Sequence, residues 1–355
     1  LLVIALTIFS FTLILDNSAW SQQSFFITSS RGNFDLDDGT KSQENVISLP
    51  PASSLLDLET NECPPAIAIY VHGIWATPAI ANEQTERVFL SLKNLNYNNP
   101  VIGFSWDSNT PFSFTIPAIS QYGWKIAKII ANNNGPLLAK FVFDFKEKCP
   151  DSEVRIVAHS LGSRVVLSSL QSINDPAQFP SLATNNNETS TSKIIKSVHL
   201  MGAAVDDEQL SIDPSDCIFN IPKLECSGIP IENQVEYFYN LYNTEDNMVA
   251  PYQIGWVEYE SIYHMNEHDD ALGASGVESR FNAPNNYDEY NVKNEILREE
   301  DANGDTYCDL PLGDSCPIYF LGDNHFGYMG FRNLNKVVYN EGVMDVILAD
   351  WISEN

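Results

Sequence analysis

Residues 154–167, VRIVAHSLGSRVVL, constrain the fold of this chain more than any other stretch. The first half is a β-branched apolar run, the second half has apolar residues at helical spacing, and Ser160 lies between them. The pattern predicts a strand, a sharp turn and a helix. A serine in such a turn has a strained backbone, and the residues two before and two after it must be small, as Ala158 and Gly162 are. The stretch therefore predicts a turn that presents Ser160 as a nucleophile.

Other apolar runs alternate with helical segments along the chain. Residues 66–71 are continuously apolar, which is typical of a strand buried on both faces of a parallel sheet. Helical patterns at 83–95 and 122–147 flank a second strand-like run at 101–106. Parallel strands that alternate with helices predict an α/β fold with a doubly wound, mostly parallel sheet flanked by helices. Further strand-like runs follow at 197–205 and 235–242.

Two motifs resemble the α/β-hydrolase superfamily: the HSLGSR run around Ser160 and the His-Gly pair that follows the strand at 66–71. The first small residue is Ala here, where the superfamily usually has Gly. The resemblance covers the chain from about residue 64 to its end. It implies an oxyanion hole made of the backbone N–H groups of Ile74 and Leu161.

The resemblance also implies the other two members of a Ser-Asp-His triad. The pattern Y-N-x-x-D-x-x-V after a later strand assigns the acid to Asp246. Asp206 and Asp207 remain the alternative, because some lipases take their acid from an earlier strand. His325 follows a final strand-like run and precedes a C-terminal helix, which is the place of the superfamily's histidine. The chain order Ser160, Asp246, His325 is that of the superfamily.

Two lid-like insertions interrupt the resemblance, at about 207–234 and 252–317. The first mixes apolar residues with two cysteines and lies where many lipases and esterases carry a lid. The second is acidic and aromatic, contains His264 and His268, and is too long for a structureless loop in a compact domain. Both insertions are expected to influence the choice of substrate.

Within the second insertion, oxygen-bearing side chains recur at alternate positions, as they do in calcium loops. The glycine and glutamate of an EF-hand are absent, and in so acidic a chain a chance cluster explains the pattern equally well. The sequence leaves a structural Ca²⁺ open and predicts no cofactor for catalysis. The candidate ligands are Asp301, Asn303, Asp305 and Asp309.

The N-terminal region predicts export of the protein. Residues 1–21 combine an apolar run with a small-x-small cleavage pattern and resemble a secretory signal peptide, and the run is short for a membrane span of about 20 residues. Residues 22–61 are rich in Ser, Asp, Asn and Gln without a sustained period, and we expect a loosely ordered segment there. Residues 62–355 form the expected catalytic domain. The mature protein is expected to be secreted, without a stable membrane anchor.

The six cysteines and a sequon at Asn187 agree with secretion. Proximity in sequence predicts two disulfides, Cys217 with Cys226 and Cys308 with Cys316. The remaining pair, Cys63 and Cys149, precede strands that the hydrolase topology places side by side, at nearly equal distances before their loops. This topology predicts a third disulfide between them.

The net charge of -28 argues against nucleic acid or anionic membranes as partners, because a polyanion is repelled over a Debye length of about 8 to 10 Å. The leading hypothesis is a secreted serine hydrolase that cleaves small-molecule or lipid esters through an acyl-enzyme on Ser160. A thioesterase, an amidase or an acyltransferase with the same triad is the alternative. A catalytically silent binding module is another, since fold alone does not fix function.

Overall fold

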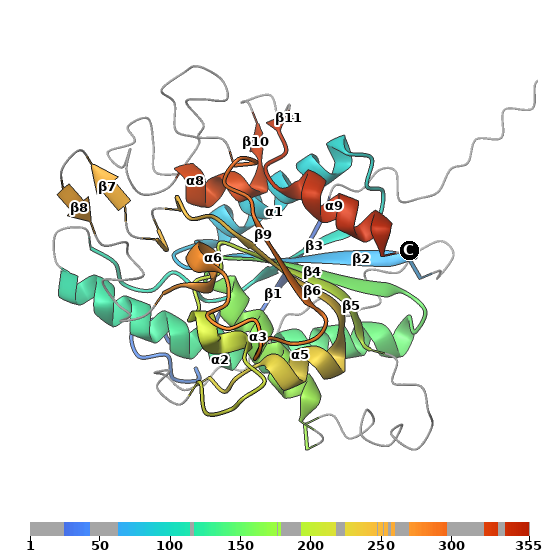
Figure 1. The fold of residues 1–355 in the computed structure, drawn as a ribbon. Coiled ribbons are helices and arrows are strands. Elements are labelled where there is room, and N and C mark those ends of the chain that lie inside the picture. The colour runs from blue at the N-terminus through green and yellow to red at the C-terminus, as the bar shows by residue number, and fades with distance from the viewer. Residues whose placement is uncertain are drawn as a thin grey trace, which may run out of the picture.

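Seven strands form the central sheet, in the order β1-β3-β2-β4-β5-β6-β9 (Figure 1). Every neighbouring pair is parallel, so the predicted α/β class with a parallel sheet is confirmed. The strands of the computed structural model are β1 (Phe26–Ser29), β2 (Ala66–Val71), β3 (Val101–Ser105), β4 (Glu153–His159), β5 (Ile195–Met201), β6 (Val235–Tyr242) and β9 (Tyr287–Asn291). The described residues are 25–42, 63–113, 117–175, 177–178, 193–217, 224–246, 248–250, 252–254, 257–259, 270–296, 323–332 and 338–354.

Helices cover both faces of the sheet (Figure 1). Helices α1 (Pro78–Asn94) and α9 (Met344–Ser353) pack on one face, and α2 (Pro117–Lys148), α3 (Gly162–Asn174) and α5 (Gly228–Gln234) pack on the other. Shorter elements are η4 (Asp207–Leu210), α6 (Leu272–Ser275), α8 (Asp323–Phe326) and η5 (Gly327–Met329), with the strand pairs β7 (Tyr252–Ile254) and β8 (Val257–Tyr259), and β10 (Phe331–Arg332) and β11 (Val338–Asn340).

The central strands are apolar on both faces because each face contacts a separate core. Ile67 and Ile69 of β2 belong to the core under α2 and α3, whereas Ala68 and Tyr70 belong to the core under α1 and α9. All of these side chains are almost fully buried. The period-2 alternation of a strand thus divides one continuous apolar run between two helix layers.

Helix α2 continues through Pro136 without a break. Proline has no N–H to donate to the carbonyl four residues earlier, which belongs to Asn132. The Ser168 hydroxyl of α3 donates to that carbonyl oxygen at 2.7 Å instead. The packing partner therefore satisfies the group that proline leaves free.

The N-terminal segment corrects one prediction. Residues 25–42, expected to be loosely ordered, contain β1, which pairs with β3 as an edge strand of the sheet. The polar residues that suggested disorder form turns. The Asp107 carboxylate accepts the Gly32 N–H at 2.8 Å, and the Asp35 carboxylate accepts the Asp37 N–H at 2.7 Å.

The second insertion also differs from its prediction, because β9 falls inside the 252–317 range and completes the sheet beside β6. In its sequence, YDEYN, only Tyr287 is buried, and the acidic residues beside it made the strand look like a loop. The run expected as a strand before His325 lies outside the described residues, and His325 itself lies in α8.

The first insertion is described at 207–217 and 224–234. Its Ser227 hydroxyl accepts from Gln171 at 3.1 Å, and Asn233 donates to Asn174 at 3.0 Å. Both partners belong to the last turn of α3, more than two turns from Ser160. The described parts of this insertion therefore cover the far end of α3.

Two of the predicted disulfides are present, Cys63–Cys149 with 5.5 Å between Cα atoms and Cys217–Cys226 with 5.4 Å. The third pair, the expected signal peptide and the sequon lie outside the described residues. Within the part of the chain that the structure describes, no helix has the length and apolar character needed to cross a bilayer.

Candidate functional site

Ser160 lies at the predicted turn between β4 and α3. Its φ is 54°, a left-handed conformation that is costly for a residue with a side chain. The turn is held by the Ser160 N–H, which donates to the Met201 carbonyl at 2.9 Å, and by its carbonyl, which accepts from the Ala204 N–H at 3.2 Å. A Cβ on Gly162 would approach the Val71 carbonyl oxygen to 2.5 Å, so only glycine fits there.

The loop after β2, residues 72–76, packs directly against this turn. A Cβ on Gly73 would lie 2.8 Å from Ser160 Cβ. Trp75 has a φ of 57°, and its N–H donates to the Ser108 carbonyl at 2.8 Å. Among the described residues, neither the Ile74 N–H nor the Leu161 N–H has a hydrogen-bond acceptor. The two backbone groups predicted to form an oxyanion hole are therefore free to donate.

Asp246 and His325 form a buried pair. His325 Nδ1 donates to Asp246 Oδ2 at 2.7 Å, and the two side chains are 2% and 0% exposed. The Met248 N–H donates to the other carboxylate oxygen at 3.0 Å, which fixes the carboxylate in the turn after β6. Burial raises the pKa of Tyr328, and the neighbouring Asp246 carboxylate raises it further, so the phenol stays neutral beside the pair.

His159, the residue before Ser160, holds His325 against the turn. Its Nε2–H donates to the His325 carbonyl oxygen at 2.7 Å, and the two rings lie 4.5 Å apart. Burial lowers the pKa of His159 well below its ordinary value, and His325 lowers it further, so this ring is neutral. The structure thus brings Asp246 and His325 together, and His325 lies against His159, the residue before Ser160. No hydrogen bond between Ser160 Oγ and the His325 ring occurs among the described contacts, and such bonds often form only when substrate binds.

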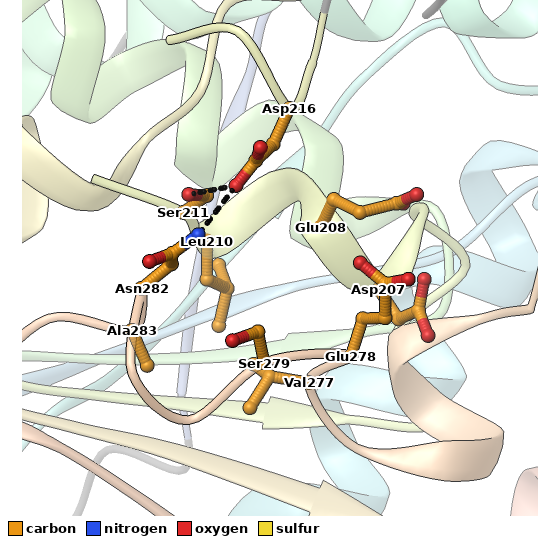
Figure 2. Close-up of a pocket in the computed structure, with 10 residues that line it drawn as sticks. All are labelled: Asp207, Glu208, Leu210, Ser211, Asp216, Val277, Glu278, Ser279, Asn282 and Ala283. Carbon is orange, nitrogen blue, oxygen red and sulfur yellow. Dashed lines mark hydrogen bonds between the residues drawn. The ribbon is translucent and has the colours of Figure 1, made fainter. Parts of the chain in front are cut away.

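The alternative acid Asp207 lies in a different pocket. The Asp207 side chain lines a small pocket together with Glu208 and Glu278, and His325 does not line it (Figure 2). In the same pocket the Asp216 carboxylate accepts from Ser211 Oγ at 2.6 Å (Figure 2). The imidazole of His325 is paired with Asp246, so the geometry favours Asp246 as its acid.

Despite its carboxylates, the pocket of Figure 2 does not have the geometry of a metal site. Among the described residues, no group of three or more His, Cys, Asp or Glu side chains could hold a metal ion. The candidate calcium ligands Asp301, Asn303, Asp305 and Asp309 lie outside the described residues, and the calcium loop stays a prediction.

Sequence reasoning missed Arg31 and the role of His72. The His72 Nε2 accepts the Trp106 N–H at 3.1 Å, and the Arg31 guanidinium lies beside it. His72 is the first residue of the 72–76 loop, and Arg31 contacts this loop at His72 and Ala76. The run FFITS at residues 25–29, shortly before Arg31, has strong β propensity and could have indicated an ordered strand there.

Comparison with known proteins identifies a family that matches part of the chain. Residues 58–224, which include Ile74, Ser160 and Leu161, match a family described as "Alpha/beta hydrolase of unknown function (DUF900)". The chain has the α/β-hydrolase fold, and residues 58–224 are similar to this family. Asp246 and His325 lie beyond the matched region. No match is found among curated protein sequences.

Solved structures similar to this α/β hydrolase include acetyl xylan esterases. The catalytic core domain of acetyl xylan esterase from Trichoderma reesei is 16% identical, and the match covers 42% of this chain and 68% of that chain with a TM-score of 0.28. An acetylxylan esterase at 0.90 Å resolution is also 16% identical, over 43% of this chain and 68% of that one, with a TM-score of 0.26. An iodinated complex of acetyl xylan esterase is 14% identical over 51% and 84%, with a TM-score of 0.27. Similarity at this level says nothing about substrate.

Proposed function

We propose that this α/β hydrolase is a serine hydrolase that cleaves carboxylic esters through an acyl-enzyme on Ser160. The observation that carries the proposal is the buried His325–Asp246 pair beside the Ser160 turn. Because Nδ1 of His325 donates to the carboxylate, Nε2 is the basic nitrogen. An imidazole whose second ring nitrogen can accept a proton, close to the strained turn that carries a serine, is the arrangement that acyl transfer needs.

In the proposed mechanism, Ser160 Oγ attacks the acyl carbon while His325 Nε2 takes the hydroxyl proton. The same nitrogen gives this proton to the departing alkoxide, and the alcohol leaves. Water then attacks the acyl-enzyme along the same proton route, which releases the carboxylic acid and restores the serine. Asp246 fixes the imidazole tautomer and stabilises the imidazolium that forms in each half-reaction.

The Ile74 and Leu161 N–H groups stabilise the tetrahedral oxyanion in this mechanism. Both groups lack an acceptor among the described residues, so neither must break a hydrogen bond when charge develops. The turn and the loop that carry them are fixed by backbone hydrogen bonds to Met201 and Ser108. Donors that are already in place cost no reorganisation during the reaction.

The proposed substrate is a small-molecule or lipid ester, and the site of action is extracellular. The Cys63–Cys149 and Cys217–Cys226 disulfides support secretion, because disulfides persist in oxidising compartments. The net charge of -28 supports a neutral or weakly charged substrate over a polyanion.

A fluorophosphonate probe tests the nucleophile. The wild-type protein should be labelled on Ser160, and Ser160→Ala should lose all labelling. Ser353→Ala is the matched control, because Ser353 is exposed on α9 and should leave labelling unchanged. An unlabelled wild-type protein that is folded would indicate a silent binding module instead of an enzyme.

A substrate series tests the reaction class. p-Nitrophenyl esters of increasing acyl length should be hydrolysed with a burst of p-nitrophenol equal to one equivalent of enzyme when deacylation is slow. Acyl thioesters and anilides of the same acyl groups serve as the comparison. Faster turnover of either comparison series would replace the ester assignment by a thioesterase or an amidase, with the same nucleophile.

A further inference from the structure

Arg31 follows β1 at the edge of the sheet, and its guanidinium reaches the back of the 72–76 loop. One Nη2–H donates to the Ala76 carbonyl oxygen at 2.8 Å and the same nitrogen lies 3.3 Å from His72 Nε2. The Nε–H donates to Ser105 Oγ at 2.7 Å. A single side chain therefore contacts both ends of the loop that carries Ile74.

The protonation state of His72 makes this contact an attractive one. Its Nδ1 lies 2.9 Å from the Gly73 carbonyl oxygen, so Nδ1 carries the proton and donates. Nε2 is then an acceptor, and it receives N–H groups from both Trp106 and Arg31. Burial lowers the pKa of His72 to about 3, and the positive charge of Arg31 adds to this effect. The ring is therefore neutral at any pH at which the enzyme would work.

Arg31 is itself fixed in place. Burial lowers its pKa to about 10, and the Asp107 carboxylate opposes this change, so the guanidinium is charged at neutral pH. The same carboxylate accepts the Gly32 N–H at 2.8 Å, which anchors the backbone next to Arg31. The planar fork of a guanidinium can satisfy several acceptors in a defined geometry, which the ammonium group of lysine cannot do.

The loop needs such support because its backbone is strained. Trp75 has a φ of 57°, and a large residue in this conformation persists only where the surroundings hold it. The Trp75 N–H donates to the Ser108 carbonyl, and the Ala76 N–H donates to Ser108 Oγ at 3.1 Å. These bonds fix the second half of the loop, and only the Arg31 side chain bridges His72 and Ala76 among the described contacts.

We propose that Arg31 is a positioning residue that holds the 72–76 loop so that the Ile74 N–H points at the oxyanion formed on Ser160. The inference rests on the proposed function and adds to it a residue that lies outside the matched family region. It assigns to the N-terminal strand a part in transition-state stabilisation, since β1 delivers Arg31 to the loop.

The test compares Arg31→Ala and Arg31→Lys in the full chain with Lys41→Met, an exposed cation on the same N-terminal segment. With p-nitrophenyl acetate, we expect kcat of Arg31→Ala to fall about 10- to 100-fold, less than the full loss of one oxyanion donor. KM should change by less than about threefold, because the ester in its ground state does not use the oxyanion hole. The fall in kcat should be smaller for Arg31→Lys, and kcat of Lys41→Met should equal that of the wild type.

Two further readouts separate positioning from general stability. Phenylboronic acid forms a tetrahedral adduct with the serine, so its affinity should fall by the same factor as kcat/KM in Arg31→Ala. Ethylguanidinium should restore part of the kcat of Arg31→Ala and none of Lys41→Met. Two results would overturn the inference: a kcat of Arg31→Ala within threefold of the wild type, or a loss of kcat that equals the unfolded fraction and is not restored by ethylguanidinium. Neither result would affect the proposal that the wild type hydrolyses esters. A wild-type protein without Ser160 labelling would overturn both proposals.

Discussion

Gly73→Ala tests whether the 72–76 loop and the Ser160 turn form one rigid unit. Gly73 has no left-handed φ, so alanine can adopt its backbone conformation, and only space is at issue. The new Cβ would lie 2.8 Å from Ser160 Cβ, 3.3 Å from Ser160 Oγ and 3.4 Å from the His159 carbonyl oxygen. Ordinary van der Waals contact begins at 3.4 Å, so the loop and the turn must separate by about 0.6 Å.

Neither side of this contact can move freely. The Ser160 backbone is bonded to Met201 and Ala204, and the loop is bonded to Ser108 and to Arg31. A misplacement of about 1 Å costs roughly 100-fold in rate, so a shift of about 0.6 Å should lower kcat/KM by about 10- to 30-fold. Overpacking of this kind also costs about 1 to 3 kcal/mol of stability.

The assay measures kcat/KM for p-nitrophenyl acetate per labelled active site, together with the urea midpoint. Gly228→Ala is the matched control, because its Cβ would lie 2.4 Å from the Ser211 carbonyl oxygen, at α5 and away from Ser160. It should destabilise the protein and leave kcat/KM of the folded fraction within about twofold, since no group near the reacting atoms shifts. A Gly73→Ala enzyme that is destabilised but retains more than a third of wild-type kcat/KM would refute the rigid-unit reasoning.

Four other outcomes are expected. Asp246→Asn should lower kcat by about 10⁴-fold, because the imidazole would take the wrong tautomer. Asp207→Asn should leave kcat within threefold of the wild type. The reverse ranking would assign the catalytic acid to the earlier strand. His325→Ala should abolish ester hydrolysis, whereas replacing either histidine of the second insertion should not, and equal losses would contradict the base assignment. Burial lowers the pKa of His72 to about 3, so below pH 6.5 the unfolded chain binds a proton that the folded protein does not. The free energy of unfolding, measured by urea titration, should therefore fall by up to about 1.4 kcal/mol per pH unit on acidification. In His72→Gln this fall should be less steep. Loss of the Cys63–Cys149 disulfide, which spans 86 residues, should lower the free energy of unfolding by about 4 to 5 kcal/mol in the chain-entropy account, without changing kcat of the folded enzyme.

The sequence predicted the centre of the sheet better than its edges, for a physical reason. The central strands β2 and β4 are covered on both faces, so burial requires apolar residues at successive positions and leaves an unmistakable run. Strand β9 has only exposed or partly buried residues after Tyr287, and its acidic residues resemble those of a loop. Strand β1 is only four residues long, and three of its residues are partly buried. An edge strand is less buried, so it does not need a continuous apolar sequence. Whether it forms depends on pairing with a strand that is distant in the sequence.

The residues of the candidate site also differ in how well the sequence predicts their roles. Asp246 and His325 could be assigned from the resemblance to the hydrolase superfamily, and the structure places them in contact. Arg31 could not, because its partners His72 and Ser105 lie 41 and 74 residues further along the chain. A hydrogen bond between such residues depends on strand pairing, which no local pattern encodes.

The topology explains why these separate residues meet. In a parallel sheet all carboxyl ends lie at one edge, where ligands bind. The order β1-β3-β2-β4 places the residues that follow these strands side by side: Arg31, then Ser105, then the 72–76 loop, then Ser160. Arg31 donates both to Ser105 Oγ and to the Ala76 carbonyl of the loop, and Gly73 of the same loop packs against Ser160. Once β1 is recognised as a strand beside β3, the position of Arg31 follows from the sheet order alone. Removal of β1 should therefore lower the catalytic rate more than it destabilises the sheet. As an edge strand, β1 pairs with one neighbouring strand only, but it carries the Arg31 side chain that supports the 72–76 loop.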